Sequence, residues 1–197
     1  CTSLSKRTVT DRLVFSLIRA FPSLEVRGGK AGGRAGDRLV LNPRLTFNYL
    51  EGSSYFVRPS VSVHATAYSL DRAEPGMTAP SRVLSTVSLD SGLIFERDAK
   101  LFGRAGVQTF EPRVFYTYTP YVEQNGNLYP NFDTTIADIS YAQLFRENRF
   151  VGNDRIGDSN ELTMAATTRY LEENGMERLR VAVAQRFNFT QPRVGLG

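Results

Sequence analysis

The chain has 197 residues, of which 41% are hydrophobic, and its mean hydropathy is −0.27. It is too apolar for a disordered chain, yet it contains no run of about 20 consecutive apolar residues from which a transmembrane helix could be built. The formal charge of +4 comes almost entirely from arginine, because Lys6, Lys30 and Lys100 are the only lysines. Arginine forks bind carboxylates and phosphates, and pairing with the chain's own Asp and Glu is the simpler interpretation.

The first 37 residues show little regular pattern. Residues 1–11 are polar, Arg12–Arg19 has the composition of a short strand, and Phe21–Asp37 contains five glycines with basic residues between them. A phosphate-binding loop would need a following helix that begins with Lys-Ser or Lys-Thr, and none follows. We therefore predict that residues 1–37 form an irregular segment with a flexible glycine-rich loop. Cys1 is the only cysteine, which excludes an internal disulfide, and its position fits a cut fragment better than a lipid-modified N-terminus.

From residue 38 onward, apolar and polar residues alternate with a period of two, which is typical of strands with one apolar and one polar face. The strands predicted in this way cover residues 38–49, 55–67, 83–95, 108–121, 161–170 and 178–189. With the segment at Arg12–Arg19 the total is about seven. Several of them are longer than the usual strand of about 5 to 6 residues.

The connections between these strands run short, long, short, very long and short. Tight turns are expected at residues 51–53, at 98–103 and at the Asn-Gly pair of Glu172–Met176, and long loops at 71–81 and 122–160. Outer-membrane barrels alternate short turns with long outer loops in this way. We therefore predict an all-β fold in which residues 38–197 form a partial antiparallel transmembrane β-barrel. It would be an arc of about seven to eight strands with long extracellular loops.

The charged residues fix which face meets lipid, because each midplane arginine in hydrocarbon costs about 2–4 kcal/mol. The apolar face is predicted to meet the bilayer, with tyrosines near the membrane boundaries: Tyr49, Tyr55, Tyr68, Tyr116, Tyr118 and Tyr170. The charged side chains are predicted to point into the lumen: Arg44, Arg58, Glu96, Glu111, Arg113, Arg169, Arg178, Arg180 and Arg186.

Other chemistries have weaker support. His64 is the sole histidine, and with Ser60, Ser62 and Asp90 it offers the parts of a barrel-embedded hydrolase, but no nucleophile elbow or oxyanion-hole sequence accompanies it. The acidic segment Gly152–Glu161 lacks the spacing of an EF-hand, and one His and one Cys cannot form a zinc site. No catalytic residue, metal, cofactor or nucleic-acid partner is predicted.

Three stretches resemble the LptD family of outer-membrane lipopolysaccharide-assembly proteins, also called OstA or Imp. They are TFEPRVFYTYTPY (Thr109–Tyr121), PNFDT (Pro130–Thr134) and YAQLFRENRFVGNDRIGDSNELT (Tyr141–Thr163). Flanking stretches at residues 62–71, 88–98 and 177–189 fit as well, so the resemblance covers Arg38–Leu196, the central barrel region. Phe110 stands where the family usually has Leu, Val122-Glu123 stands where Arg-Asp is common, and residues 1–36 match poorly.

The resemblance implies part of a translocon in the outer membrane of a Gram-negative bacterium that inserts lipopolysaccharide into the outer leaflet and is not an enzyme. A charged lumen would pass the glycan and phosphate part while the acyl chains stay with lipid. The implied partners are lipopolysaccharide, an LptE-like plug lipoprotein, and an LptA-like periplasmic bridge that joins through an N-terminal domain absent from this chain. A passive porin or another β-barrel channel is the alternative function, and a barrel-embedded hydrolase is a weaker one.

Two sets of residues follow as candidates for this function. The lipopolysaccharide path is predicted to be lined by Arg113, Glu111, Arg178, Arg180 and Arg169. The loop 122–160 is too aromatic to remain in water, so it is predicted to fold inward or to pack on the plug, with a short helix over Ile139–Phe145. Its candidate plug contacts are Tyr141, Leu144, Phe145, Phe150 and Arg155.

Overall fold

A computed structural model describes residues 25–31, 34–48, 50–70, 80–101, 103–124 and 129–196. Most of its regular structure is one antiparallel sheet of ten strands. These are β1 (Glu25–Ala31), β2 (Arg34–Leu41), β3 (Arg44–Thr46), β4 (Leu50–Glu51), β5 (Tyr55–Leu70), β6 (Ser81–Leu93), β7 (Phe95–Leu101), β8 (Arg104–Thr119), β11 (Ser159–Glu172) and β12 (Glu177–Asn188). Among the described residues, no helix is long and apolar enough to cross a membrane.

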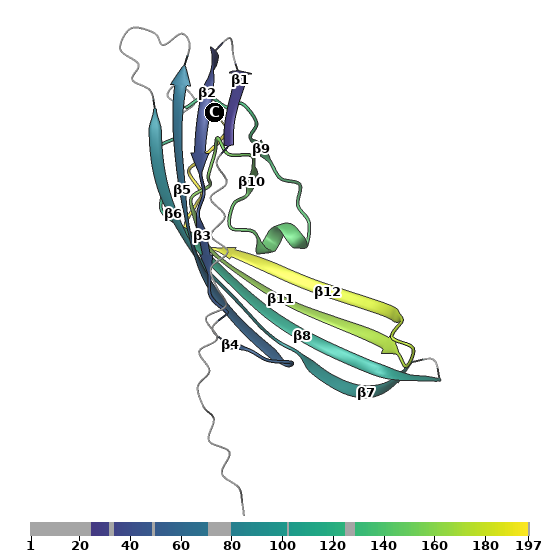
Figure 1. The fold of residues 1–197 in the computed structure, drawn as a ribbon. Coiled ribbons are helices and arrows are strands. Elements are labelled where there is room, and N and C mark those ends of the chain that lie inside the picture. Colours follow the sequence, from purple (N-terminus) through teal and green to yellow (C-terminus); the bar gives the residue numbers. More distant parts are fainter. Residues whose placement is uncertain are drawn as a thin grey trace, which may run out of the picture.

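The strands follow the order β1-β2-β5-β6-β8-β11-β12, while β3 and β4 pair with β5 and β7 pairs with β8. The short strands therefore lengthen the sheet beside β5 and β8 and do not add new positions to the order. Within the described part, β1 pairs only with β2 and β12 only with β11, so the sheet is open. The predicted all-β antiparallel fold is confirmed, and Figure 1 shows the sheet as a curved arc.

The glycine-rich stretch was predicted to be a flexible loop, and this is wrong for most of its length. Strands β1 and β2 run through it, with Gly28 opposite Asp37 and Gly29 opposite Gly36. Glycine is uncommon within strands, so the composition favoured a loop, but backbone pairing to β5 extends the sheet into this region. The strand predicted at Arg12–Arg19 lies outside the described residues.

The two faces of the sheet differ in chemistry. Along β6, exposed and buried residues alternate from Ser81 to Leu89, and the pairing of Val87 with Tyr118 and of Ser88 with Thr117 carries this alternation onto β8. The exposed face presents large apolar side chains, including Leu39, Val61, Val87, Leu89, Phe110, Val114, Tyr118, Met164, Val183 and Phe187. The opposite face carries Arg38, Arg58, Arg82, Glu111, Arg113, Glu161 and Arg169.

Of the tyrosines predicted at the apolar face, one lies on the charged face and another stays on the apolar face but is buried. Tyr68 lies opposite Arg38 in the register, on the charged face, and is only 2% exposed. Tyr170 is also buried, because its hydroxyl donates to the carbonyl of Arg104 and its ring covers Gly106. Tyr49 lies outside the described residues.

From β4 onward, tight turns and long connections lie at opposite ends of the strands (Figure 1). The turn after β11 places Gly175 at a φ of 80°, and the turn after β7 places Gly103 at 79°, a backbone region that glycine adopts without strain. Strands β5 and β8 both end where the long connections begin. The predicted alternation of short and long connections is confirmed.

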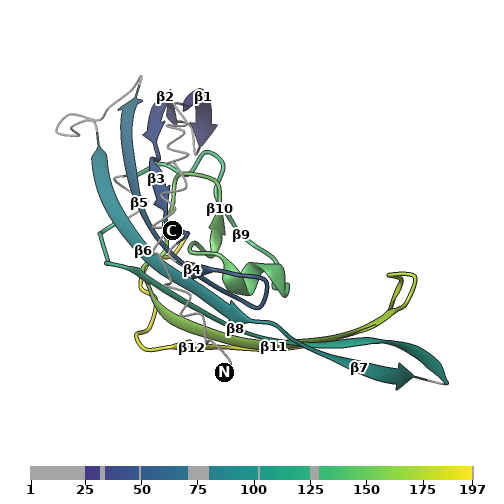
Figure 2. The same cartoon turned by 60° about the horizontal axis from the view of Figure 1, so that its bottom comes forward.

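The long connection after β8 folds back over the concave, charged face (Figure 2). Its described part, residues 120–124 and 129–158, is called the docked loop here and contains β9 (Thr135–Ile136), the 3-10 turn η1 (Ala142–Phe145) and β10 (Phe150–Val151). The core lies between the docked loop and the sheet and includes Val40, Leu84, Phe115, Phe150 and Ile156. The predicted inward fold is confirmed, and the helix expected over Ile139–Phe145 is reduced to η1.

The two faces give a matched test. Ala166 lies opposite Val183 on the apolar face, and Ala184 lies opposite Ala165 on the charged face. Ala166→Arg is expected to lower the free energy of unfolding of the full-length protein by about 2–4 kcal/mol, because it places a guanidinium in hydrocarbon. Ala184→Arg should cost far less. Urea unfolding in lipid vesicles measures both, and equal losses would show that both faces meet the same solvent.

Candidate functional site

The docked loop is held by one buried carboxylate. Asp154 is 0% exposed, and its Oδ1 accepts hydrogen bonds from Arg38 Nη1 at 2.6 Å and from the Tyr68 hydroxyl at 2.9 Å. Its Oδ2 accepts the backbone N–H groups of Phe132 and Asp133 at 2.7 and 2.8 Å. Asp154 therefore ties β2 and β5 to two separate parts of the docked loop.

A second carboxylate completes this anchor. Arg38 forks onto Asp133 with contacts of 2.8 and 2.7 Å while it also holds Asp154. The hydrogen bond from Arg38 keeps the pKa of Asp133 well below its ordinary value, so this loop carboxylate remains charged. Removing one partner from such a buried arrangement leaves an uncompensated charge, which is strongly unfavourable.

Two further arginines satisfy backbone carbonyls of the docked loop. Arg82 on β6 donates to the carbonyls of Asp154 at 2.5 Å and Asn153 at 2.8 Å, and to the side chain of Gln124 at 2.8 Å. Arg155 donates to the carbonyl of Tyr129 at 2.7 Å and is 0% exposed. In this segment, which has little secondary structure, the arginines satisfy backbone carbonyls that strand pairing would otherwise satisfy.

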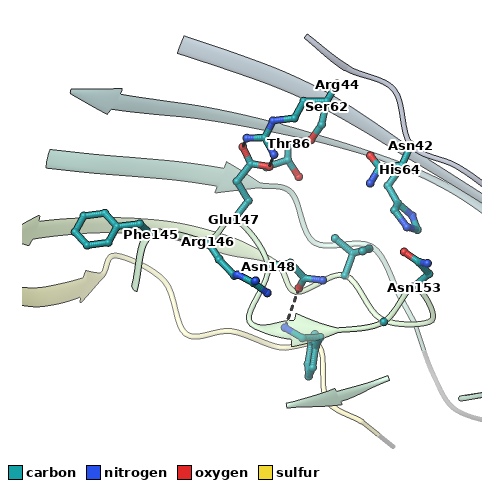
Figure 3. A pocket seen from close by; sticks show the side chains of 13 residues that line it. Asn42, Arg44, Ser62, His64, Thr86, Phe145, Arg146, Glu147, Asn148 and Asn153 are labelled. Atoms are coloured by element: carbon teal, nitrogen blue, oxygen red, sulfur yellow. Dashed lines mark hydrogen bonds and ion pairs between the residues drawn. The ribbon is translucent and has the colours of Figure 1, made fainter. Parts of the chain in front are cut away.

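Glu147 makes a more exposed attachment. It accepts hydrogen bonds from Arg44 at 2.6 Å and from Ser88 at 2.6 Å, and it also contacts Ser60 at 3.2 Å. Figure 3 shows Glu147 meeting Arg44 at the side of a cavity of about 350 Å³ between the docked loop and β5 and β6. Arg146 and His64 also line this cavity.

A second, larger cavity holds most of the residues predicted to line the lipid path. This arginine cavity, of about 490 Å³, is lined by Glu111, Arg113, Arg169 and Arg180 together with Arg58, which was not among those candidates. Arg113 forks onto Asp90 at 2.8 and 2.7 Å, and Arg169 binds Glu111 at 2.7 Å. The fifth candidate, Arg178, is not in the cavity lining, because it pairs with Glu172, which also binds Arg104.

The predicted plug contacts separate into two groups. Phe150 is 4% exposed and Arg155 is fully buried, so both side chains are used within this chain. Tyr141, by contrast, is 41% exposed, and Leu144 and Phe145 are half-buried beside it. The Leu144 carbonyl accepts a hydrogen bond from Thr163 at 2.8 Å, which fixes η1 on β11.

The residues of the hydrolase alternative are engaged elsewhere. His64 Nδ1 lies 3.2 Å from Thr66 Oγ1, Ser60 shares a hydrogen bond with Ser88 at 2.6 Å, and Asp90 binds Arg113. A serine nucleophile needs its base within hydrogen-bonding reach, whereas in the described part of the chain the hydrogen-bonding partner at His64 Nδ1 is Thr66. The structure therefore gives this alternative no catalytic arrangement.

The acidic segment has a structural use as well. Asp158 accepts the backbone N–H groups of Arg193 and Val194 at 2.9 and 3.0 Å, and Asp154 is taken up by Arg38. Within the described ranges, no group of three or more His, Cys, Asp or Glu residues could hold a metal ion.

Substitution of Asp154 is expected to destabilise the docked loop strongly. Asp154→Ala is expected to lower the free energy that holds the docked loop in place by about 3–5 kcal/mol, because Arg38 and two backbone N–H groups lose a buried acceptor. Asp138→Ala is the matched control, since Asp138 lies in the same loop and is exposed. Limited proteolysis of the full-length protein should cut the loop of the first variant much faster, and equal cleavage of both would remove Asp154 as the anchor.

A steric prediction uses two glycines with left-handed backbones. A Cβ on Gly152 would lie 2.5 Å from the carbonyl oxygen of Asp133, whereas a Cβ on Gly103 meets nothing within 4 Å. Both have positive φ, so alanine strains the backbone at each. Gly152→Ala should therefore reduce urea resistance clearly more than Gly103→Ala, and the opposite order would contradict the close packing at the anchor.

Comparison with known families agrees with this arrangement. The family model described as "LptD: LPS transport system D" matches residues 6–197. The match includes most of the first 36 residues, which were expected to fit poorly. Strand β1 and the start of β2 lie within that stretch.

Proteins named "LPS-assembly protein LptD" are similar to this chain. The protein from Burkholderia pseudomallei (strain 1710b) is 44% identical over 166 residues, which are 82% of this chain and 21% of that protein. The protein from Azoarcus sp. (strain BH72) is 44% identical over 167 residues, 82% of this chain and 20% of its own length. The protein from Paracidovorax citrulli (strain AAC00-1) is 49% identical over 142 residues, which are 71% of this chain and 17% of that protein.

The chain spans about a fifth of the length of the curated relatives it matches. The family match covers nearly all of the chain, and the similarity to individual relatives covers most of it. The chain therefore belongs to the LptD family, an outer-membrane protein family of Gram-negative bacteria.

Proposed function

We propose that this chain is a section of the wall of a β-barrel that inserts lipopolysaccharide into the outer leaflet of the outer membrane. Its apolar face meets the bilayer. Its concave face borders the passage for the glycan and phosphate part, while the acyl chains remain with lipid. The proposal rests on the family and on the division of the sheet into one apolar and one charged face.

The strands are long enough for this position. Strand β8 has 16 residues and β11 has 14. At about 3.3 Å per residue and a tilt of about 45°, each can cross an apolar band about 25 Å tall. The residues beyond the band leave room for the charged clusters near the tight turns, such as Arg104 with Glu172.

The docked loop favours a plugged machine over a passive porin. A porin needs a water-filled lumen, whereas here the docked loop lies over the concave face of the sheet and is held by the buried Asp154. A loop anchored by a buried ion pair is not displaced by small solutes. Solute flux through the full-length protein in liposomes should therefore be low, and free flux of sugars would favour the porin.

The exposed part of the docked loop fits the plug lipoprotein. Ile139 is 94% exposed, Ile136 63% and Tyr141 41%, so apolar side chains are presented on the inner side of the arc. In our proposal an LptE-like lipoprotein covers them. An LptA-like periplasmic bridge would join through a part of the protein outside this chain.

Photo-crosslinking tests the two faces directly. A crosslinker at Ala182, which lines the arginine cavity, should form adducts with lipopolysaccharide in cells that carry the full-length protein. A crosslinker at the neighbouring Val183, which is 64% exposed on the apolar face, should label bulk phospholipid. Lipopolysaccharide adducts at Val183 but not at Ala182 would contradict the proposed path.

A second crosslinking experiment tests the plug. Crosslinkers at Ile139 and Tyr141 should capture the partner lipoprotein, whereas one at the buried Phe150 should not. The full-length complex is the sample, and mass spectrometry identifies the adduct. Absence of lipoprotein adducts at both exposed positions would remove this part of the loop from the plug interface.

A further inference from the structure

The arginine cavity brings like charges together on one patch of the concave face. Its lining includes four guanidinium groups, from Arg58, Arg113, Arg169 and Arg180, and one carboxylate, Glu111. These residues come from β5, β8, β11 and β12, so neighbouring strands converge on one hollow. Such a concentration of positive charge in a concave site attracts anions.

The strand register places two of these arginines side by side. Arg169 lies directly opposite Arg180 on the same face of β11 and β12. Like charges directly opposite each other destabilise an antiparallel pair. Arg169 pairs with Glu111 at 2.7 Å and Arg180 pairs with Glu177 at 2.9 Å, and the charge of Glu111 also acts on Arg180. A bound dianion could bridge both guanidinium groups and relieve the repulsion.

Small side chains give the cavity its room. Arg113 on β8 pairs with Gly92 on β6 and with Ala165 on β11. Ala165 in turn pairs with Ala184 on β12. Two residues further along β11, Thr167 pairs with Ala182 on β12. Of these small residues, Thr167 and Ala182 line the cavity beside the arginines, and the volume of the cavity is about 490 Å³.

The guanidinium groups are held in place by ion pairs but remain accessible to solvent. The fork onto Asp90 fixes Arg113, which also stacks over the Phe145 ring at 4.0 Å, and yet its side chain is 36% exposed. Arg169 is equally exposed, and Arg180 is 54% exposed. A guanidinium has five N–H donors, and the fork onto Asp90 uses two of those on Arg113. The buried Nε of Arg169 has no partner among the described residues.

From these observations we infer that the arginine cavity is a discrete binding site for a phosphorylated sugar. Arg169 and Arg180 bind the phosphate, Arg113 orients it, and the polar floor at Thr167 contacts the sugar ring. Arginine forks suit phosphate oxygens in particular. The inference rests on the proposed function for the origin of the ligand, since lipopolysaccharide carries such groups, but the binding chemistry is shared with any sugar phosphate.

The test uses the full-length protein with its lipoprotein partner and measures binding by calorimetry. The probes are deacylated lipopolysaccharide oligosaccharide, the same oligosaccharide stripped of phosphate, and glucose 6-phosphate. Wild-type protein should bind the phosphorylated oligosaccharide at least 10-fold more tightly than the stripped form. Arg169→Gln with Arg180→Gln should abolish this preference. Arg178→Gln, which alters an ion pair outside the cavity, should leave it unchanged.

The outcomes separate this inference from the proposed function. Equal binding of both oligosaccharides by wild type, or an unchanged preference in the double variant, would overturn the phosphate site. Lost preference together with slower appearance of lipopolysaccharide at the cell surface supports both ideas. Lost preference with normal transport keeps the site but removes it from the lipid path. Binding of glucose 6-phosphate as tight as that of the phosphorylated oligosaccharide would identify a free sugar phosphate as the ligand.

Discussion

The attachment of the docked loop to the sheet depends on one buried carboxylate, Asp154. A charge with no exposure is tolerated only where it is fully paired, and here Arg38, Tyr68 and two backbone N–H groups supply the partners. Because these partners come from β2, β5 and the docked loop, forming them brings the loop against the sheet. The packing of the rest of the loop on the inner face of the sheet depends on that attachment.

The attachment also shapes the candidate binding site. Once the docked loop lies on the concave face, η1 sits against β8 and β11, where Phe145 packs beside Phe115 and stacks on Arg113. Tyr141 contacts Thr167 at 3.0 Å and joins the lining of the arginine cavity. The loop thus closes one side of the cavity, while the strands supply its charges and its floor.

Much of this fold could be predicted from the sequence because the two faces meet different surroundings. Neighbours such as Arg113 and Val114 must point in opposite directions, so a period of two shows the strands and their orientation. The aromatic content of residues 122–160 likewise indicated a loop that leaves water. The Asn-Gly pair correctly marked the turn at Gly175.

The anchor could not be predicted, because its parts are far apart in the sequence. Arg38 is 95 residues from Asp133 and 116 from Asp154, and no local pattern links them. Arg155 was predicted to contact the plug, and only the structure shows that Asp154 and Arg155 are fully buried. Arg178 lies outside the arginine cavity, where it pairs with Glu172 beside the register shift after Tyr170.

The central claim is that the sheet separates lipid from a charged interior, and strand β12 offers the most direct measurement. Nearly all of its side chains are exposed, so a spin label can be scanned from Glu177 to Asn188 with little damage to packing. In the full-length protein in lipid vesicles, oxygen should reach the label best at odd positions such as Val181 and Val183. A water-soluble nickel complex should reach it best at even positions such as Arg180 and Ala182. Equal aqueous access along the whole strand would contradict the account.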